Sequence, residues 1–262
     1  MTVSSIIADV ADAIFEARST RRQIAPLAGA HGTLSAEDAY RAQDINTQRW
    51  TSAGRRIVGR KIGLTSRAVQ AQLGVDSPDY GVLWGDTAYG DGDTVSVSAF
   101  MQPKVELEIA FVMGRAVSAA DCTLSELISA IDFAIPAIEI VDSAIADWKI
   151  SLADTIADNA SGGGFVLGAS PRRITALDLR LCGAILSCNG EAASVGLGAA
   201  CMGNPLNAAL WLVRKMATVG HPVRAGEVIL SGALGPMHAV EPGSVYTAEI
   251  QGFAPLHLAF GS

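Results

Sequence analysis

Hydrophobic side chains occupy every second position from Val105 to Phe111, and Glu106 and Glu108 lie between them. This period of two predicts a strand with one apolar face. Residues 109–112 carry no charge, which indicates that the strand is largely buried. Two carboxylates that are neighbours on one face of such a strand repel each other unless a positive group lies between them. A divalent cation bound by oxygen atoms is the group that we expect there.

A different spacing, of three and four residues, predicts two helices at the start of the chain. The apolar residues from Ile6 to Phe15 follow this spacing, and the first helix should fray near residues 18–22. The second helix is predicted to begin after the N-cap residue Ser35 and to end near Trp50. We expect these helices to form an N-terminal cap over residues 1–55, and residues 56–262 to form one strand-rich catalytic unit.

The rest of the chain is predicted to consist mainly of short strands separated by Gly, Pro and Asp. The strands are expected at residues 57–64, 94–97, 105–112, 135–141, 228–231, 244–250 and 256–260. A capping box at Thr123–Glu126 predicts one further helix, and Asn204 and Gly220 delimit another. Residues 72–81 are predicted as a loop because of their Gly, Pro and Asp content. These elements describe an α+β fold in which a mixed, strand-rich sheet carries helices on its flanks.

Glu139 is the only charged residue among residues 135–141. Taken alone, it is best explained as a strand-edge carboxylate that faces solvent. Together with Glu106 and Glu108, it gives three glutamates in two otherwise apolar strands, which favours a cation that all three share. None of the four histidines and four cysteines has the spacing of a zinc site.

Lys61 and Asp79 are candidate reacting groups, and each has a structural alternative. Lys61 lies in the apolar run 57–64 and could be an edge-strand lysine with its ammonium in water. If it projects toward the glutamates, it can donate a hydrogen bond to an oxyanion or carry a proton. Asp79 lies in the predicted loop, where the usual role of an aspartate is to accept hydrogen bonds from turn amides.

Composition narrows the class of protein. The 262 residues carry a net charge of −7, which argues against a nucleic-acid partner. Half of the residues are hydrophobic, yet no apolar run is long enough for a membrane span and no signal peptide is visible. The four cysteines are interpreted as small hydrophobic residues in a reducing compartment, so we expect a cytoplasmic protein.

Several segments resemble the 2-keto-4-pentenoate hydratase family of the fumarylacetoacetate hydrolase superfamily. They are Gly59–Thr65, Gln72–Val75, Gln102–Glu108, Asp154–Ser161, Gly203–Ala209 and Leu230–Met237. The resemblance implies a strand-rich β-roll or distorted barrel. It also implies that Glu106, Glu108 and Glu139 bind Mg²⁺ or Mn²⁺, that Lys61 and Asp79 are the acid/base groups, and that Leu73 and Ser161 contact substrate.

The implied reaction is the addition of water to a 2-hydroxy-2,4-dienoate from aromatic meta-cleavage, which gives a 4-hydroxy-2-oxo acid. The resemblance further implies a homo-oligomer, a pentamer or a pair of pentamers, and association with a neighbouring enzyme of the pathway. Three alternatives stay open. One is a 2-oxo-3-hexenedioate (4-oxalocrotonate) decarboxylase of the same family, and another is a non-catalytic partner that binds a cation. The third, a superfamily hydrolase, is disfavoured because residues 159–164 contain no lysine.

Overall fold

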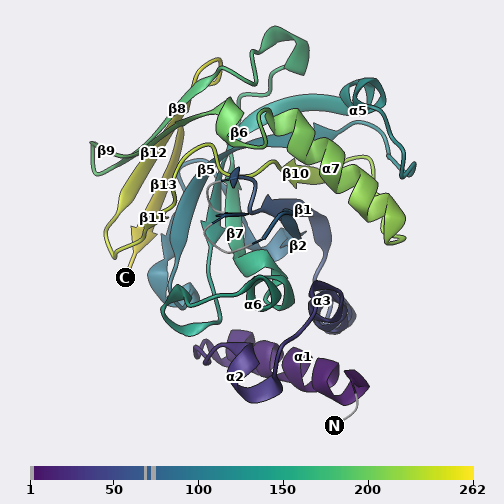
Figure 1. Cartoon of the computed structure of the whole chain (residues 1–262). Coiled ribbons are helices and arrows are strands. Elements are labelled where there is room, and N and C mark those ends of the chain that lie inside the picture. Colours follow the sequence, from purple (N-terminus) through teal and green to yellow (C-terminus); the bar gives the residue numbers. More distant parts are fainter. Residues whose placement is uncertain (1–2, 68–69, 72–74) are drawn as a thin grey trace.

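Figure 1 shows the computed structural model of the chain, which describes residues 3–67, 70–71 and 75–262. The strands are β1 (Ile57–Gly63), β2 (Asp79–Trp84), β3 (Ala88–Gly90), β4 (Thr94–Ser96), β5 (Lys104–Met113), β6 (Ile131–Val141), β7 (Gly162–Leu167), β8 (Gly183–Cys188), β9 (Glu191–Leu197), β10 (Val228–Leu230), β11 (His238–Ala239), β12 (Val245–Ile250) and β13 (Leu256–Gly261). The α-helices are α1 (Val3–Thr20), α2 (Leu27–His31), α3 (Ala36–Ser52), α5 (Leu124–Ala130), α6 (Leu152–Ala157) and α7 (Pro205–Thr218). Short 3₁₀ turns are η1 (Gly85–Thr87), η2 (Val97–Ala99), η3 (Ala146–Trp148), η4 (Asn159–Ser161), η5 (Ile174–Ala176) and η6 (Gly198–Ala200).

The strands form two mixed sheets with helices on their flanks, the α+β architecture that the sequence predicts. The larger sheet has the order β2-β1-β10-β5-β6-β7-β3, and β11 pairs with the start of β5. The smaller sheet has the order β4-β13-β12-β8-β9. Within the described residues the larger sheet runs from β2 to β3 without closing into a barrel, so the fold is an open roll.

The long antiparallel pair β5–β6 lies at the centre of the larger sheet. On β5 the side chains of Val105, Leu107, Ile109 and Phe111 are all buried in the main hydrophobic core, as the alternation predicts. Their burial fixes the register of the strand, because a slip by one residue would exchange its two faces. The glutamates of β5 are therefore held on the opposite face.

The predicted helix boundaries agree with the structure. Helix α1 ends at Thr20, and Ser35 caps α3 by accepting a hydrogen bond from the Asp38 N–H. The capping box of Thr123 and Glu126 begins α5. Asn204 caps α7 by accepting from the Leu206 N–H. These signals act within one turn of chain, which is why the sequence alone was sufficient to find them.

Helices α1, α2 and α3 pack together below the sheets, at the purple end of the chain in Figure 1. With Ala144, Ile145 and residues of α6 they enclose a hydrophobic cluster of their own. Gln43 of α3 joins this cluster to the sheet, because its side-chain amide donates to the carbonyls of Tyr80, at 3.0 Å, and Ile156, at 2.8 Å. The division of the chain at residue 55 into a cap and a catalytic unit stays a prediction.

Two local predictions differ from the structure. Residues 79–81 do not belong to a loop, because β2 begins at Asp79 and pairs with β1 as far as Gly63. Sheet pairing satisfies the backbone groups of this segment despite its turn-prone composition. Helix α6 was not predicted, since its six residues are too few to show a helical period. Among the described helices, none combines the length and the apolar character needed to cross a membrane.

Candidate active site

The three glutamates meet on one face of the β5–β6 pair. Glu106 lies directly opposite Glu139 in the antiparallel register, and Glu108 follows two residues along the same face of β5. One carboxylate oxygen from each of the three residues lies within 4.8 Å of the others. Glu108 and Glu139 are completely buried, and Glu106 is half-buried. The structure therefore excludes the solvent-facing interpretation of Glu139.

The hydrogen bonds of this cluster are incomplete. Glu108 Oε2 accepts from the Gly232 N–H at 2.7 Å. Within the described residues, Glu108 Oε1 and Glu139 Oε2 have no hydrogen-bond partner, and Glu139 Oε1 has only its ion pair with Lys61 Nζ at 3.1 Å. Buried polar atoms normally have partners, so such convergent, unpaired oxygens need a further explanation. A hard divalent cation with oxygen ligands fits them in number and chemistry. The residues present therefore suit a metal of the Mg²⁺ or Ca²⁺ type.

Burial and mutual repulsion raise the pKa values of these carboxyl groups in the metal-free protein. Burial, reinforced by the neighbouring Glu139, raises the pKa of Glu106 to about 7. Burial, together with Glu139 and Glu106, raises the pKa of Glu108 well above its ordinary value. A bound cation would lower these pKa values and favour the charged form of the carboxylates.

Lys61 brings a positive charge to the same cluster. Its Nζ lies 3.1 Å from Glu139 Oε1 and donates to the Ala160 carbonyl at 2.8 Å. Burial alone would lower its pKa, but the nearby Glu139, Asp79 and other glutamates outweigh that effect and raise the pKa above the ordinary value. Since β1 lies between β2 and β10, the edge-strand interpretation of Lys61 is wrong. Its side chain is a buried ammonium, only 3% exposed.

Asp79 lies beside Lys61, at the start of β2 and opposite Gly63 of β1. Its Oδ2 accepts from the Thr155 hydroxyl at 3.1 Å, whereas its Oδ1 has no hydrogen-bond partner in the described part of the chain. Burial raises the pKa of Asp79, and Lys61 opposes that rise. A Cβ at position 63 would lie 2.2 Å from Asp79 Oδ1, so a larger residue there would displace the Asp79 carboxyl group. Asp79 is thus an interior carboxyl group and not a satisfied turn residue.

A small cavity of about 100 Å³ joins these groups. Its polar lining consists of Lys61, Thr65, Ser66, Asp79, Glu106, Thr155 and Ser161. Val141, Trp148, Ile150, Ala233 and Met237 are among the apolar residues that complete it. Of the two residues predicted to contact substrate, Ser161 lines the cavity and Leu73 lies outside the described residues.

Sequence reasoning assigned no role to Thr155 and Trp148. Thr155 lies on the unpredicted helix α6, which begins with a capping box between Ser151 and Asp154. Trp148 lies in the turn η3 and donates its indole N–H to the Gln102 carbonyl at 3.1 Å. The capping box was the one signal in the sequence that could have located α6. No local signal shows that either side chain reaches this cavity.

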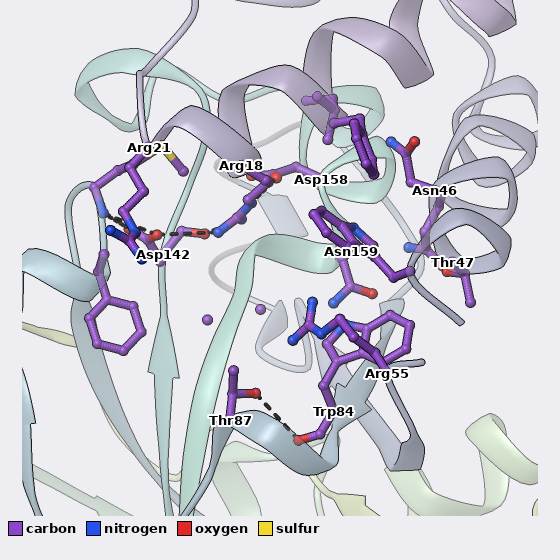
Figure 2. Close-up of a pocket in the computed structure, with 18 of the residues that line it drawn as sticks. Arg18, Arg21, Asn46, Thr47, Arg55, Trp84, Thr87, Asp142, Asp158 and Asn159 are labelled. Atoms are coloured by element: carbon purple, nitrogen blue, oxygen red, sulfur yellow. Dashed lines mark hydrogen bonds and ion pairs between the residues drawn. The ribbon is translucent and has the colours of Figure 1, made fainter. Parts of the chain in front are cut away.

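A second, larger cavity of about 350 Å³ lies between the N-terminal helices and the sheet (Figure 2). Its two acidic residues are already engaged, since Arg18 contacts Asp158 at 2.7 Å and Asp142 at 3.2 Å. Asp142 also accepts from the backbone N–H groups of Met101 and Gln102. This cavity lacks the unpaired carboxylates of the first one, so we place the candidate chemistry at the smaller cavity.

Comparison with known proteins agrees with this fold and site. Residues 55–259 match the family described as fumarylacetoacetate (FAA) hydrolase C-terminal. A 2-keto-4-pentenoate hydratase of Paraburkholderia xenovorans (strain LB400) is 51% identical over 254 residues, 97% of this chain and 94% of that protein. A 2-hydroxyhexa-2,4-dienoate hydratase of Comamonas testosteroni is 39% identical over 249 residues, 94% of each chain.

Among solved structures, 4-oxalocrotonate decarboxylase from Pseudomonas putida G7, complexed with magnesium and adipate, superposes with a TM-score of 0.94. It is 33% identical, and the match covers 99% of this chain and 98% of that one. The similarity extends over both sheets and over the N-terminal helices. This chain therefore belongs to the 2-keto-4-pentenoate hydratase family, within the fumarylacetoacetate hydrolase superfamily.

Proposed function

We propose that this protein is a metal-dependent hydro-lyase that adds water to a 2-hydroxy-2,4-dienoate such as 2-hydroxypenta-2,4-dienoate. The product is a 4-hydroxy-2-oxo acid, and the step belongs to aromatic meta-cleavage degradation. The observation that carries this choice is the 51% identity to a 2-keto-4-pentenoate hydratase, against 33% to the decarboxylase. The three converging carboxylates beside Lys61 and Asp79 supply the chemistry that the reaction needs.

One carboxylate oxygen from each of Glu106, Glu108 and Glu139 would hold the metal, Mg²⁺ or Mn²⁺. When bound, the ion supplies Lewis-acid stabilisation for negative charge on the 2-oxygen of the substrate. Three carboxylates and one divalent ion leave a net charge of −1, and the Lys61 ammonium balances it. These four side chains and the ion are then neutral together, which lowers the electrostatic cost of binding an anionic substrate.

The remaining residues orient the substrate and move protons. Lys61 and Asp79 are the acid/base groups, and Ser161 contacts the polar end of the substrate from η4. Leu73 is proposed as a further substrate contact. Trp148, Ile150 and Met237 form the apolar wall against which the hydrocarbon end of a dienoate packs.

The alternative with most support is decarboxylation of a 2-oxo-3-hexenedioate. A dicarboxylate would need a second positive group in the cavity to balance its terminal carboxylate. Among the described lining residues Lys61 is the only cation, and it is paired with Glu139. This favours a substrate with one carboxylate, and hence hydration.

An ultraviolet assay tests the function directly. Purified protein with added Mg²⁺ is mixed with dienols that carry or lack a terminal carboxylate, and dienol absorbance and released CO₂ are followed together. We expect the monocarboxylate dienols to bleach without CO₂. Release of CO₂ from the dicarboxylate would establish a decarboxylase instead. Hydrolytic cleavage of the substrate into two fragments would establish a hydrolase. If no dienol reacts, the protein is a non-catalytic cation-binding partner.

We also propose that the enzyme works in the cytoplasm as a homo-oligomer, a pentamer or decamer, and associates with a neighbouring enzyme of its pathway. Apolar side chains on the outer face of the smaller sheet support self-association, because Ile185, Val195 and Val245 are 40%, 64% and 49% exposed. Light scattering behind a sizing column tests this. A monodisperse species near the chain mass of 27.1 kDa would refute the oligomer.

A further inference from the structure

Three side-chain oxygens form a continuous chain beside the candidate active site. Ser161 Oγ lies 3.3 Å from Thr155 Oγ1, which lies 3.1 Å from Asp79 Oδ2. The residues come from three different elements, η4, α6 and β2, and each is buried to at least 95%. All three line the small cavity. A buried run of oxygens that begins at the substrate cavity and ends at a carboxyl group is a geometry suited to proton transfer.

The direction of these hydrogen bonds follows from the number of protons available. An ionised Asp79 can only accept, so Thr155 must give its single hydroxyl proton to Asp79 Oδ2. Thr155 can then only accept from Ser161, and the Ser161 proton points toward Thr155. The lone pairs of Ser161 Oγ are left for a donor bound in the cavity. While Asp79 is ionised, Ser161 therefore acts as an acceptor toward substrate.

We propose that Ser161, Thr155 and Asp79 form a hydroxyl relay that carries the proton of the dienol 2-hydroxyl to Asp79, with Thr155 as its obligatory middle member. This rests on the proposed function, which requires the dienol to lose that proton. The substrate O–H breaks as Ser161 Oγ takes its proton. Ser161 passes its own proton to Thr155, and Thr155 passes its own to Asp79 Oδ2.

The relay leaves charges and bonds in balance. Both hydroxyls are restored, Asp79 is neutral, and the negative charge lies on the substrate oxygen, so nothing is oxidised or reduced. The chain of hydrogen bonds is now reversed, because Asp79 donates to Thr155 and Thr155 donates to Ser161. Ser161 has become a donor toward substrate, and the same path can return the proton. One residue set thus serves both as base and as acid.

The surrounding structure favours Asp79 Oδ2 over Asp79 Oδ1 as the oxygen that receives the proton. Asp79 Oδ1 is the oxygen that lies against the Gly63 backbone, as the 2.2 Å approach of an added Cβ shows. Oδ2 is the oxygen that faces the hydroxyls. Gln43 holds Asp79 and Thr155 at a fixed distance from each other. Its side-chain amide donates to the carbonyls of Tyr80 and Ile156, the residues that follow Asp79 and Thr155. Helix α6 is anchored at its other end, where Asp154 Oδ1 accepts from the Leu27 N–H at 2.8 Å.

The test begins with the wild-type enzyme loaded with Mg²⁺. The rate of dienol consumption is measured in mixtures of H₂O and D₂O. A relay moves several protons together, so we expect a curved dependence of kcat on the deuterium fraction, whereas a linear dependence would mean that one proton moves and would overturn the relay. A wild-type enzyme without hydratase activity would refute the proposed function and the relay together.

The second arm removes the middle hydroxyl. Thr155→Val should lower kcat by about 100-fold with KM changed by less than about 3-fold, and Thr155→Ser should recover activity to within about 10-fold of wild type. Mg²⁺ affinity, measured by calorimetry, should stay at the wild-type value in both variants. Thr247→Val, in the smaller sheet, is the matched control and should be fully active.

If wild-type hydration is robust and Thr155→Val retains a near wild-type kcat, the relay is refuted while the proposed function stands. Should Thr155→Val fail to fold, Ser161→Ala breaks the same chain at its substrate end. That variant should show the same loss of kcat together with a linear deuterium dependence, and retention of the curved dependence would contradict the relay.

Discussion

Glu106 and Glu139 lie directly opposite each other on the antiparallel strands β5 and β6, with Glu108 two residues further along the same face. Like charges in this position destabilise a sheet unless they are neutralised. Lys61, 3.1 Å from Glu139, supplies one positive charge, and protons or a metal ion must supply the rest. The stability of the central sheet is therefore coupled to what the cluster binds.

Glutamine substitutions test the three carboxylates as metal ligands. Glu106→Gln, Glu108→Gln and Glu139→Gln should each abolish stoichiometric Mg²⁺ binding and lower turnover by at least about 100-fold, because a neutral amide replaces a charged oxygen ligand. Metal content after dialysis and the dienol assay measure the two effects. Glu249→Gln, on an exposed position of β12, is the control and should behave as wild type. Full metal content in the Glu108 variant would contradict the assignment.

The raised carboxyl pKa values predict that metal stabilisation depends on pH. The folded, metal-free protein binds more protons than the unfolded chain between the ordinary glutamate pKa of 4.5 and the Glu106 pKa of about 7. Its stability must therefore fall as pH rises through this range. Bound Mg²⁺ removes that penalty, so Mg²⁺ should raise Tm more at about pH 8 than at about pH 5.

Differential scanning calorimetry with and without Mg²⁺ at the two pH values measures this difference. Binding of Mg²⁺ near pH 7 should also release protons, which appears as a dependence of the calorimetric heat on the ionisation enthalpy of the buffer. Equal Tm shifts at both pH values, with no buffer dependence, would rule out protons as competitors of the metal.

Lys61→Met should preserve the fold of the metal-loaded protein and lower kcat by at least about 100-fold, because the site loses its buried ammonium. Steady-state kinetics separate this from a binding defect. Lys149→Met removes an exposed lysine that pairs with Asp147 at the surface, and it should have no effect. A change confined to KM would mean that Lys61 only attracts the anionic substrate.

Arg18→Leu should destabilise the protein by roughly 3–5 kcal/mol, because it leaves the buried carboxylates of Asp142 and Asp158 without their cationic partner. Denaturant unfolding measures the change. The exposed pair of Arg41 and Glu37 gives a matched comparison, and Arg41→Leu should cost at most about 1 kcal/mol. Equal effects of the two substitutions would show that the Arg18 contacts seen in Figure 2 contribute no more than a surface pair.

Local signals in the sequence are sufficient to place several elements of the fold. The alternation of Val105 to Phe111 placed β5 and the face that carries its glutamates, and the caps at Ser35, Thr123 and Asn204 placed three helices. The alternation of apolar and polar residues and the capping of helix ends both depend on neighbours within a few residues. They can therefore be recognised in the amino-acid sequence alone. The isolation of Glu106, Glu108 and Glu139 in apolar strands was visible for the same reason.

The pairing of the strands and the surroundings of each polar side chain depend on the tertiary structure. The insertion of β10 between β1 and β5 makes β1 an interior strand and buries Lys61. No feature of the sequence near Lys61 predicts this pairing. Asp79 meets Thr155, 76 residues away, because Gln43 and the β1–β2 pairing bring α6 beside β2. Sequence periodicity determines the face of the strand on which a side chain lies. The residues that the side chain contacts depend on how distant segments pack together, because packing and burial act between residues that are far apart in the chain.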